Sequence, residues 1–200
     1  MTGRLVLASA SPRRRELLGR LGLDPVVRPV DVDERARPGE GARDLVMRLA
    51  RDKAAACSAT DDEVVVAADT VVVVDDHVLG KPADRADATA MLRRLSGRDH
   101  DVLTAVVVRR GERVAEAVTA TQVTFRTLDP AEIAWYVASG EPDDKAGGYA
   151  IQGGAGAFVT GIVGSDTSVI GLPLAVTVDL LRAVGWDPYG GATAPGRSPA

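Results

Sequence analysis

VVVAADTVVVV, residues 64–74, consists of two valine-rich runs separated by Asp69 and Thr70. Unbroken β-branched runs are typical of strands covered on both faces, so we expect strand segments at Val64–Ala68 and Val71–Val74 in the centre of a sheet. A carboxylate there is costly to bury unless it is paired or faces a cleft at the end of the sheet. Asp69 is therefore a candidate catalytic residue. The alternative is a strand-end or β-bulge aspartate bonded to nearby amides.

Strand-like and helix-like patterns alternate on both sides of this run. Before it, the sequence predicts a strand at 4–8, a helix from Pro12 to Gly22, a strand at 26–30 and a helix at 42–58. After it come a helix at 86–95, a hairpin of strands 102–109 and 114–125, a helix opened by the capping box Asp129–Glu132, a strand at 157–163 and a helix at 172–184. This order predicts an α/β fold.

The bulk composition limits the classes of protein. A chain of 200 residues that is 46% hydrophobic suits one compact domain or two joined lobes, which we place at residues 1–186. Residues 187–200 are rich in Pro, Gly, Ala and Ser and are expected to be a mobile tail. No apolar run approaches the roughly 20 residues of a membrane span, and Met1–Arg4 lacks an apolar leader, so we expect a cytoplasmic protein that binds no membrane.

The net charge and the least frequent residue types further limit the kinds of ligand that the protein could bind. A net charge of −4 argues against general nucleic-acid binding, so a polyanionic ligand would need a local basic cluster. Only three of the 24 basic residues are lysines, Lys53, Lys81 and Lys145, which suggests that these positions need a compact ammonium. The single cysteine, Cys57, is interpreted as a packing residue. His77 and His100 are interpreted as surface or hydrogen-bonding residues.

The segment Ser9-Ala10-Ser11-Pro12-Arg13-Arg14 lies at a strand-to-helix junction. A helix N-terminus carries partial positive charge, and two hydroxyls with two guanidiniums added there would make a phosphate pocket. The alternative is an ordinary N-cap followed by a solvated face. Basic residues in a first turn oppose the helix dipole, however, and this favours an anion-binding role.

Acidic residues form a second candidate cluster. Asp31, Asp33 and Glu34 occupy one loop, and together with Asp69 they could supply the oxygen ligands that Mg²⁺ or Mn²⁺ prefers. Lys53, near the end of a helix, could be no more than a partner of the helix dipole. Lys81 lies in the turn Gly80–Pro82, which is not a P-loop.

Several blocks together resemble the Maf family of nucleotide pyrophosphatases, also called septum-formation inhibitors. The resemblance extends from Leu5 to Gly185. The blocks are LASASPRRRELL, DVDE, RLARDKAAA, VVAADTVV, LGKP, LSGRDHDVLTAV, EPDDKAGGYAIQG and GLPLAV. Several such blocks in family order are far more specific than any one of them.

The resemblance implies a Maf/ITPase-like fold with a long twisted mixed β-sheet, flanking helices and a cleft between two lobes. It also implies metal-dependent hydrolysis of a nucleoside triphosphate to the monophosphate and pyrophosphate, as a house-cleaning activity. Metal would bind Glu34 and Asp69, and Asp69 would also activate water. The substrate-binding residues implied are Ser9, Ser11, Arg13, Arg14, Lys53, Thr70, Lys81 and Gln152.

One branch of the family is similar in having arginine, threonine and glutamine where this chain has Arg13, Thr70 and Gln152. That branch acts on dTTP, UTP and modified pyrimidine nucleotides, and a glutamine amide can match a uracil or thymine edge. The family also implies a possible homodimer. This chain departs from the family at Asp166 and Ser168, where a tyrosine and an asparagine are usual.

Two rival functions remain open at this point. One is a nucleotide-binding regulator of cell division and septum formation that does not depend on turnover. The other is a triphosphatase that releases orthophosphate stepwise. The first would show saturation by nucleotide without product, and the second would be identified by its products.

Overall fold

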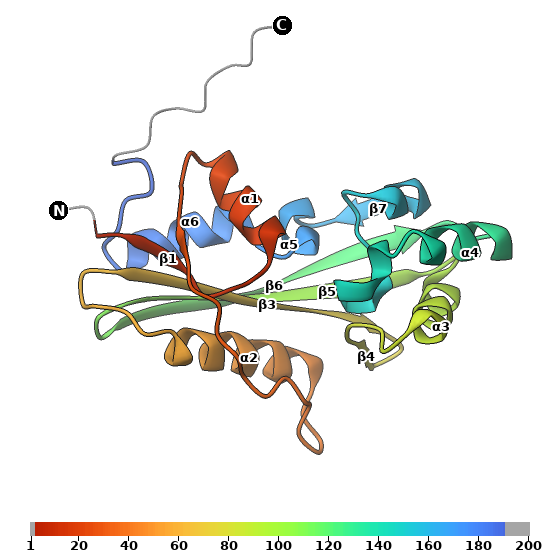
Figure 1. Cartoon of the computed structure of the whole chain (residues 1–200), viewed down its shortest axis with the longest axis horizontal. Coiled ribbons are helices and arrows are strands. Elements are labelled where there is room, and N and C mark those ends of the chain that lie inside the picture. Colours follow the sequence, from red (N-terminus) through yellow and green to blue (C-terminus); the bar gives the residue numbers. More distant parts are fainter. Residues whose placement is uncertain (1–2, 191–200) are drawn as a thin grey trace, which may run out of the picture. The chain divides into compact units, whose positions relative to one another are not determined.

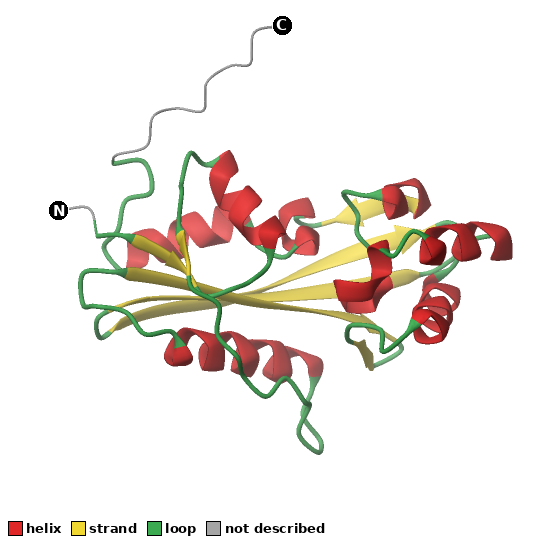
Figure 2. Cartoon of the chain, viewed as in Figure 1, coloured by secondary structure: helices red, strands yellow, loops and turns green. Residues whose placement is uncertain are grey.

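A computed structural model describes residues 3–190 of the chain, and within these residues seven strands form one mixed sheet. The order is β2-β1-β3-β5-β6-β7, and β4 pairs with β3 outside this path. The strands are β1 (Leu5–Leu7), β2 (Val26–Val27), β3 (Val64–Val74), β4 (His77–Leu79), β5 (Asp99–Arg110), β6 (Arg113–Phe125) and β7 (Val159–Val163). Helices flank the sheet (Figure 2), which confirms the predicted α/β class.

The helices are α1 (Pro12–Arg20), α2 (Ala42–Ala56), α3 (Arg85–Leu95), α4 (Pro130–Ala138), α5 (Asp166–Ile170) and α6 (Leu174–Ala183). Three short 3₁₀ helices, η1 (Glu141–Asp144), η2 (Ala146–Gly148) and η3 (Gly154–Phe158), lie between α4 and β7. No helix within residues 3–190 is long and apolar enough to cross a membrane.

The chain divides into two compact units. The first unit contains residues 3–69, 105–118 and 171–190 of the described chain, and the second contains residues 70–104 and 119–170. The long strands β3, β5 and β6 each contribute residues to both units. That residues 1–186 act as one domain stays a prediction.

The first unit is built on β1, which pairs in parallel with β2 and β3. Helix α2 covers one face of these strands, whereas α1 and α6 cover the other (Figure 1). Double coverage explains why Leu7 and the segment Val64–Ala68 are completely buried. Helix α1 starts with Pro12, as predicted, and the chain leaves it through Gly22, whose positive φ of 75° suits glycine.

The second unit has its own core, in which α3 and α4 pack together with parts of β3, β5 and β6. Four aromatic side chains are buried there: Phe125, Tyr136, Tyr149 and Phe158. Their rings meet edge to face, with the centroids of Phe125 and Tyr149 4.9 Å apart. Strand β7 pairs antiparallel with β6 through a register shift between Thr124 and Phe125.

The valine-rich run forms one continuous strand rather than the two expected segments, and both Asp69 and Thr70 lie within β3. The prediction of an interruption was wrong because an ion pair compensates the buried carboxylate without a break in the backbone. The strand predicted at Val26–Val30 is also shorter. The last hydrogen bond between this segment and β1 is donated by the amide of Arg28 to the Leu7 carbonyl. Pairing stops there because Pro29 has no amide hydrogen to donate.

The remaining elements follow the sequence prediction within a few residues. The capping box of Asp129 and Glu132 at the start of α4 is confirmed. Strand β4 and helix α5 were not predicted. His100 was interpreted as a surface or hydrogen-bonding residue. It is 3% exposed, and its Nε2 lies 2.8 Å from the Tyr149 hydroxyl, so the hydrogen-bonding alternative is confirmed.

Cys57 is a buried packing residue at the C-terminal cap of α2, as predicted, and burial raises the pKa of its thiol. Asp187–Gly190, the described part of the expected tail, forms a turn in which Tyr189 lies against Arg182 of α6. The rest of that predicted tail, 191–200, lies outside the described residues.

Candidate functional site

Lys53 joins two of the predicted site residues in the first unit. It projects from α2, and its Nζ lies 2.6 Å from Asp69 Oδ1 and 2.6 Å from Glu34 Oε1. The side chains of Lys53 and Asp69 are each 11% exposed, whereas that of Glu34 is 45% exposed. The ammonium thus holds a buried strand carboxylate beside one that solvent can reach.

Arg14 of α1 belongs to the same charged cluster. Its Nη1 donates a 3.0 Å hydrogen bond to Ser9 Oγ, and its Nε donates a 2.9 Å bond to the Gly171 carbonyl. Burial lowers the pKa of Arg14, while the negative charges of Asp69 and Glu34 oppose that shift. The Arg14 guanidinium therefore lies close enough to both carboxylates for their charges to interact.

Arg13 and Ser11 lie at the start of α1. The positive charge of Arg13 contributes to lowering the pKa of Arg14, so the two guanidiniums lie near one another. Ser11 is the N-cap residue, but its side chain makes no capping hydrogen bond, and the first turn contains no acidic residue. An ordinary side-chain cap is therefore absent, and the anion-binding role of this segment stays a prediction.

The loop that carries Glu34 is braced from α2 by Arg48. Its guanidinium makes bonds of 2.6 and 2.8 Å to the two oxygens of Glu40, and it donates a 3.0 Å bond to the carbonyl of Arg35. Hydrogen bonding from Arg48 lowers the pKa of Glu40 to about 2. The residue that follows Glu34 is thus fixed through its backbone.

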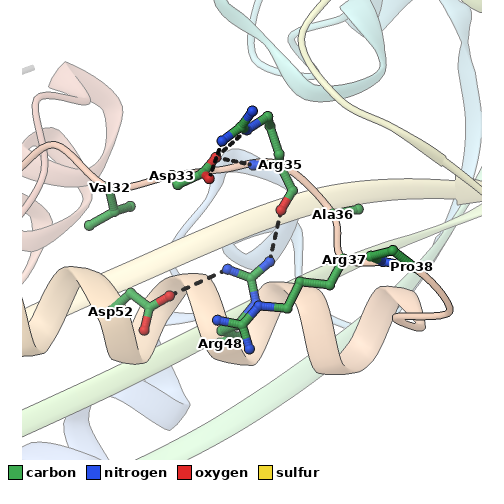
Figure 3. Close-up of a pocket in the computed structure, with 8 residues that line it drawn as sticks. All are labelled: Val32, Asp33, Arg35, Ala36, Arg37, Pro38, Arg48 and Asp52. Carbon is green, nitrogen blue, oxygen red and sulfur yellow. Dashed lines mark hydrogen bonds and ion pairs between the residues drawn. The ribbon is translucent and has the colours of Figure 1, made fainter.

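A pocket of about 490 Å³ lies between this loop and α2. Figure 3 shows Arg48 reaching from α2 toward the Arg35 carbonyl on one side and toward Asp52 on the other. Asp33, which was weighed as a metal ligand with Glu34, is bonded instead to the Arg35 side chain at 2.7 and 2.8 Å. That pairing lowers the pKa of Asp33.

Thr70, Lys81 and Gln152 belong to the second unit. The hydroxyls of Thr70 and Thr104 are 3.0 Å apart, and Thr104 donates its proton to the Ser168 carbonyl at 2.8 Å, so Thr70 must be the donor to Thr104. Ser168 itself is buried in α5 with no hydrogen-bond partner for its Oγ.

Lys81 and Gln152 are carried by backbone segments that contact one another. The amide of Gly147 donates a 3.0 Å bond to the carbonyl of Gly80, which precedes Lys81. Both Lys81 and Gln152 are exposed. Within the second unit, the structure therefore joins the Gly80–Pro82 turn to the glycine-rich segment that leads to Gln152.

The sequence did not single out the residues that brace these segments. Arg48 and Glu40 resemble any surface pair in sequence, since their eight-residue separation across a loop fits no local rule. Thr104 lies within a strand pattern and gave no signal. Glu141 and Tyr136, which contact the segment around Gln152, lie in a helix and its exit. Only the helix-period pattern of α4 could have predicted that Tyr136 faces inward.

A divalent metal is compatible with Glu34 and Asp69, although residues 3–190 contain no group of three or more His, Cys, Asp or Glu side chains arranged to hold an ion. The two carboxylates converge on one ammonium, so both face the same point. Mg²⁺ is commonly held by one or two carboxylates with substrate phosphates and water completing its shell. The donor set fits that manner of binding.

The first unit brings three cationic and two acidic side chains into one partly buried cluster, which therefore carries one excess positive charge. Its members are Arg13, Arg14, Lys53, Glu34 and Asp69. Clusters of this kind are typical of proteins that bind phosphate groups. The chain belongs to the Maf-like protein family, whose model matches residues 4–184.

Relatives with assigned activities match over nearly their full length. The chain is 55% identical to the dTTP/UTP pyrophosphatase of Anaeromyxobacter sp. (strain Fw109-5), with all of both chains covered. It is 58% identical to the dTTP/UTP pyrophosphatase of Anaeromyxobacter dehalogenans (strain 2CP-C), with 93% of this chain and 96% of the relative covered. It is 52% identical to the dTTP/UTP pyrophosphatase of Myxococcus xanthus (strain DK1622), with 90% and 92% covered.

Proposed function

We propose that this protein is a nucleoside triphosphate pyrophosphatase that hydrolyses dTTP and UTP between the α- and β-phosphates. The products are the nucleoside monophosphate and pyrophosphate. The observation that carries the proposal is the placement of Lys53 between Asp69 and Glu34. Arg14 lies close enough for the charges of both carboxylates to affect its pKa. The names of the relatives, which share more than half of their residues with this chain, support the choice of dTTP and UTP.

The cationic residues of the first unit would bind the triphosphate. Arg13 and Arg14 extend from the first turn of α1, where the helix dipole adds to their charge. The bonds that hold Arg14 to Ser9 and Gly171 fix its guanidinium before substrate arrives, so little order is lost on binding. Charge that develops on the leaving pyrophosphate would be stabilised by the same residues.

Asp69 would orient a water molecule and accept its proton during in-line attack on the α-phosphorus. Lys53 donates to Oδ1 of Asp69, which fixes the orientation of this carboxylate in β3. Most of the rate enhancement would come from positioning and charge stabilisation, as in other phosphoryl transfers. Glu34 and Asp69 would hold Mg²⁺ or Mn²⁺, which supplies neutralisation of phosphate charge.

Residues of the second unit would set the choice of nucleotide. Lys81 would bind phosphate, and Gln152 would hydrogen-bond the pyrimidine edge, with Thr70 and Arg13 contributing to selectivity. A pyrimidine 2,4-dione presents both donors and acceptors, and the glutamine amide offers both in return. The family resemblance supports these roles, as it does a possible homodimer in the cytoplasm.

The experiment that tests the proposal is a nucleotide panel with product analysis. Purified protein is incubated with dTTP, UTP, CTP, GTP and ATP, with Mg²⁺, with Mn²⁺, and with chelator alone. Release of monophosphate and pyrophosphate from dTTP and UTP, only with metal, is the expected result. Stepwise orthophosphate release would identify a triphosphatase instead. Saturable nucleotide binding without any product would identify a regulator without turnover.

A further inference from the structure

Gln152 lies at the tip of a tight turn in the second unit. The amide of Gly153 donates a 3.0 Å bond to the carbonyl of Ala150, so Ile151 and Gln152 are the two central residues of a β-turn. The Gln152 side chain is exposed, and its amide forms no hydrogen bond with any of residues 3–190. The turn therefore presents an unengaged amide to solvent.

The start of this turn is fixed by a buried tyrosine. The amide of Ala150 donates a 2.9 Å bond to the hydroxyl of Tyr136, whose side chain in α4 is completely buried. The preceding residue, Tyr149, has its own hydroxyl 2.8 Å from Nε2 of the buried His100. Both anchors come from the aromatic core, so the entry to the turn cannot shift without disturbing that core.

The end of the turn is fixed by Glu141 of η1. Its Oε2 accepts a 2.9 Å bond from the amide of Gly154. Its carboxylate also occupies the space beside Gly153, because a Cβ added at Gly153 would lie only 1.6 Å from Glu141 Oε1. A Cβ at position 153 would therefore displace the Glu141 carboxylate from its present place.

The two anchors interact electrostatically. The Tyr136 hydroxyl accepts from the Ala150 amide, so its own proton is available for the Glu141 carboxylate. Burial raises the pKa of Tyr136, and the negative charge of Glu141 raises it further. The phenol that holds the start of the turn and the carboxylate that holds its end therefore influence each other.

We propose that Tyr136 and Glu141 are positioning residues for nucleobase selectivity, and that they act by holding the Ala150–Gly153 turn so that the Gln152 amide meets the base edge in one orientation. This inference rests on the proposed function, in which Gln152 recognises the base. An amide that must both donate and accept discriminates well only when its position is fixed. Loss of an anchor should therefore lower the selectivity between nucleotides more than it lowers kcat.

The test compares kcat and KM for dTTP, UTP, CTP and GTP among four variants and the wild type. In Tyr136→Phe and Glu141→Ala, the ratio of kcat/KM for the preferred nucleotide to that for the poorest should fall about tenfold, mainly through KM. Glu141→Gln keeps an oxygen that can accept from Gly154 and should recover much of the ratio. Ser96→Ala is the matched control, because it also removes a hydroxyl that accepts a backbone amide, that of Leu128 at 2.8 Å.

A double-mutant cycle tests the anchor at Glu141 directly. Gly153→Ala should displace the carboxylate and lower selectivity as Glu141→Ala does, but it should add nothing in the Glu141→Ala background. Fully additive effects would overturn the role of Glu141. An unchanged selectivity ratio in folded Tyr136→Phe and Glu141→Ala, or an equal fall in Ser96→Ala, would overturn the whole inference.

Failure of the inference can be told from failure of the proposed function in the same assay. If the wild type releases pyrophosphate from dTTP and UTP but the anchor variants keep its selectivity, only the inference is refuted. If the wild type releases pyrophosphate from no nucleotide, the proposed function is refuted, and the positioning role goes with it.

Discussion

Lys53 donates a 2.6 Å hydrogen bond to Asp69, and both side chains are almost completely withdrawn from solvent. Removing one partner of such a pair leaves an uncompensated charge, which is strongly destabilising. The strand and the helix that carry these two residues are therefore tied together by the same contact that orients the proposed catalytic carboxylate. The same ion pair thus contributes both to the stability of the first unit and to the orientation of the proposed catalytic carboxylate.

Asp69→Asn should abolish turnover in a protein that still folds, although with lower stability, because Glu34 remains as an ion-pair partner of Lys53. The amide keeps the shape of the side chain and an oxygen for Lys53, but it cannot accept a proton from water, so kcat should fall on the order of 10³-fold. Pyrophosphate release measures the effect, and circular dichroism checks the fold. Asp61→Asn, at an exposed position, serves as the control. Undiminished pyrophosphate release by Asp69→Asn would refute the assignment.

Arg48→Ala should impair catalysis although Arg48 is not proposed to touch substrate. Its bonds to Glu40 and to the Arg35 carbonyl hold the loop that carries Glu34, and a loosened loop should lower kcat/KM about 10- to 100-fold. Arg51→Ala is a matched control, since Arg51 lies on the same helix and pairs with Glu116 at the surface. Equal losses in the two variants would contradict a specific role of Arg48.

His100 should make the protein less stable in mild acid. Burial lowers its pKa from 6.5 to about 4, so the unfolded chain binds a proton more readily than the folded chain does. The stability contributed by neutral His100 is complete above about pH 6.5 and is lost as the pH falls through about pH 4. The full loss is about 3 kcal/mol.

Chemical denaturation at pH 7.5 and pH 4.5 measures this effect. The fall in unfolding free energy between the two pH values should be smaller in His100→Gln than in the wild type. His77→Gln, which replaces the exposed histidine of β4, should behave as the wild type. The same fall in all three proteins would show that His100 is not the source.

Ser168→Ala should be neutral or stabilising by up to about 1 kcal/mol, because the buried Ser168 hydroxyl has no hydrogen-bond partner. Ser165→Ala is the contrasting variant. Its hydroxyl lies 3.0 Å from that of Thr167 and accepts from the Ser168 amide at 3.3 Å, so its removal should destabilise. Thermal unfolding of both variants measures these effects. A clear loss of stability in Ser168→Ala would mean that the Ser168 hydroxyl has a hydrogen-bond partner in solution.

Much of the fold could be predicted because local rules governed it. The proline of α1, the capping box of α4 and the dense valines of β3 each act within a few residues. The structure agrees with these predictions, except that β3 continues through Asp69 without the expected interruption. Strand β4 was missed because three residues show no periodicity. Helix α5, with only five residues, was missed for the same reason.

The candidate site could be predicted only in part. The residues that carry charge, such as Asp69 in a valine run, were found because their placement is costly without a partner. The partner itself depends on tertiary structure, since Lys53 and Asp69 are 16 residues apart and no local period relates them. Bracing residues such as Arg48 and Tyr136 are invisible in sequence because their role exists only through contacts with distant backbone.

The buried thiol of Cys57 has a practical consequence. It is the only cysteine of the chain, and its burial and raised pKa make it a poor target for maleimides and iodoacetamides. A second cysteine introduced at an exposed position, such as Asp143 in η1, could thus be tagged with a fluorophore or spin label while the native one is left in place. Nucleotide-dependent changes beside Glu141 could then be followed spectroscopically in an otherwise unaltered protein.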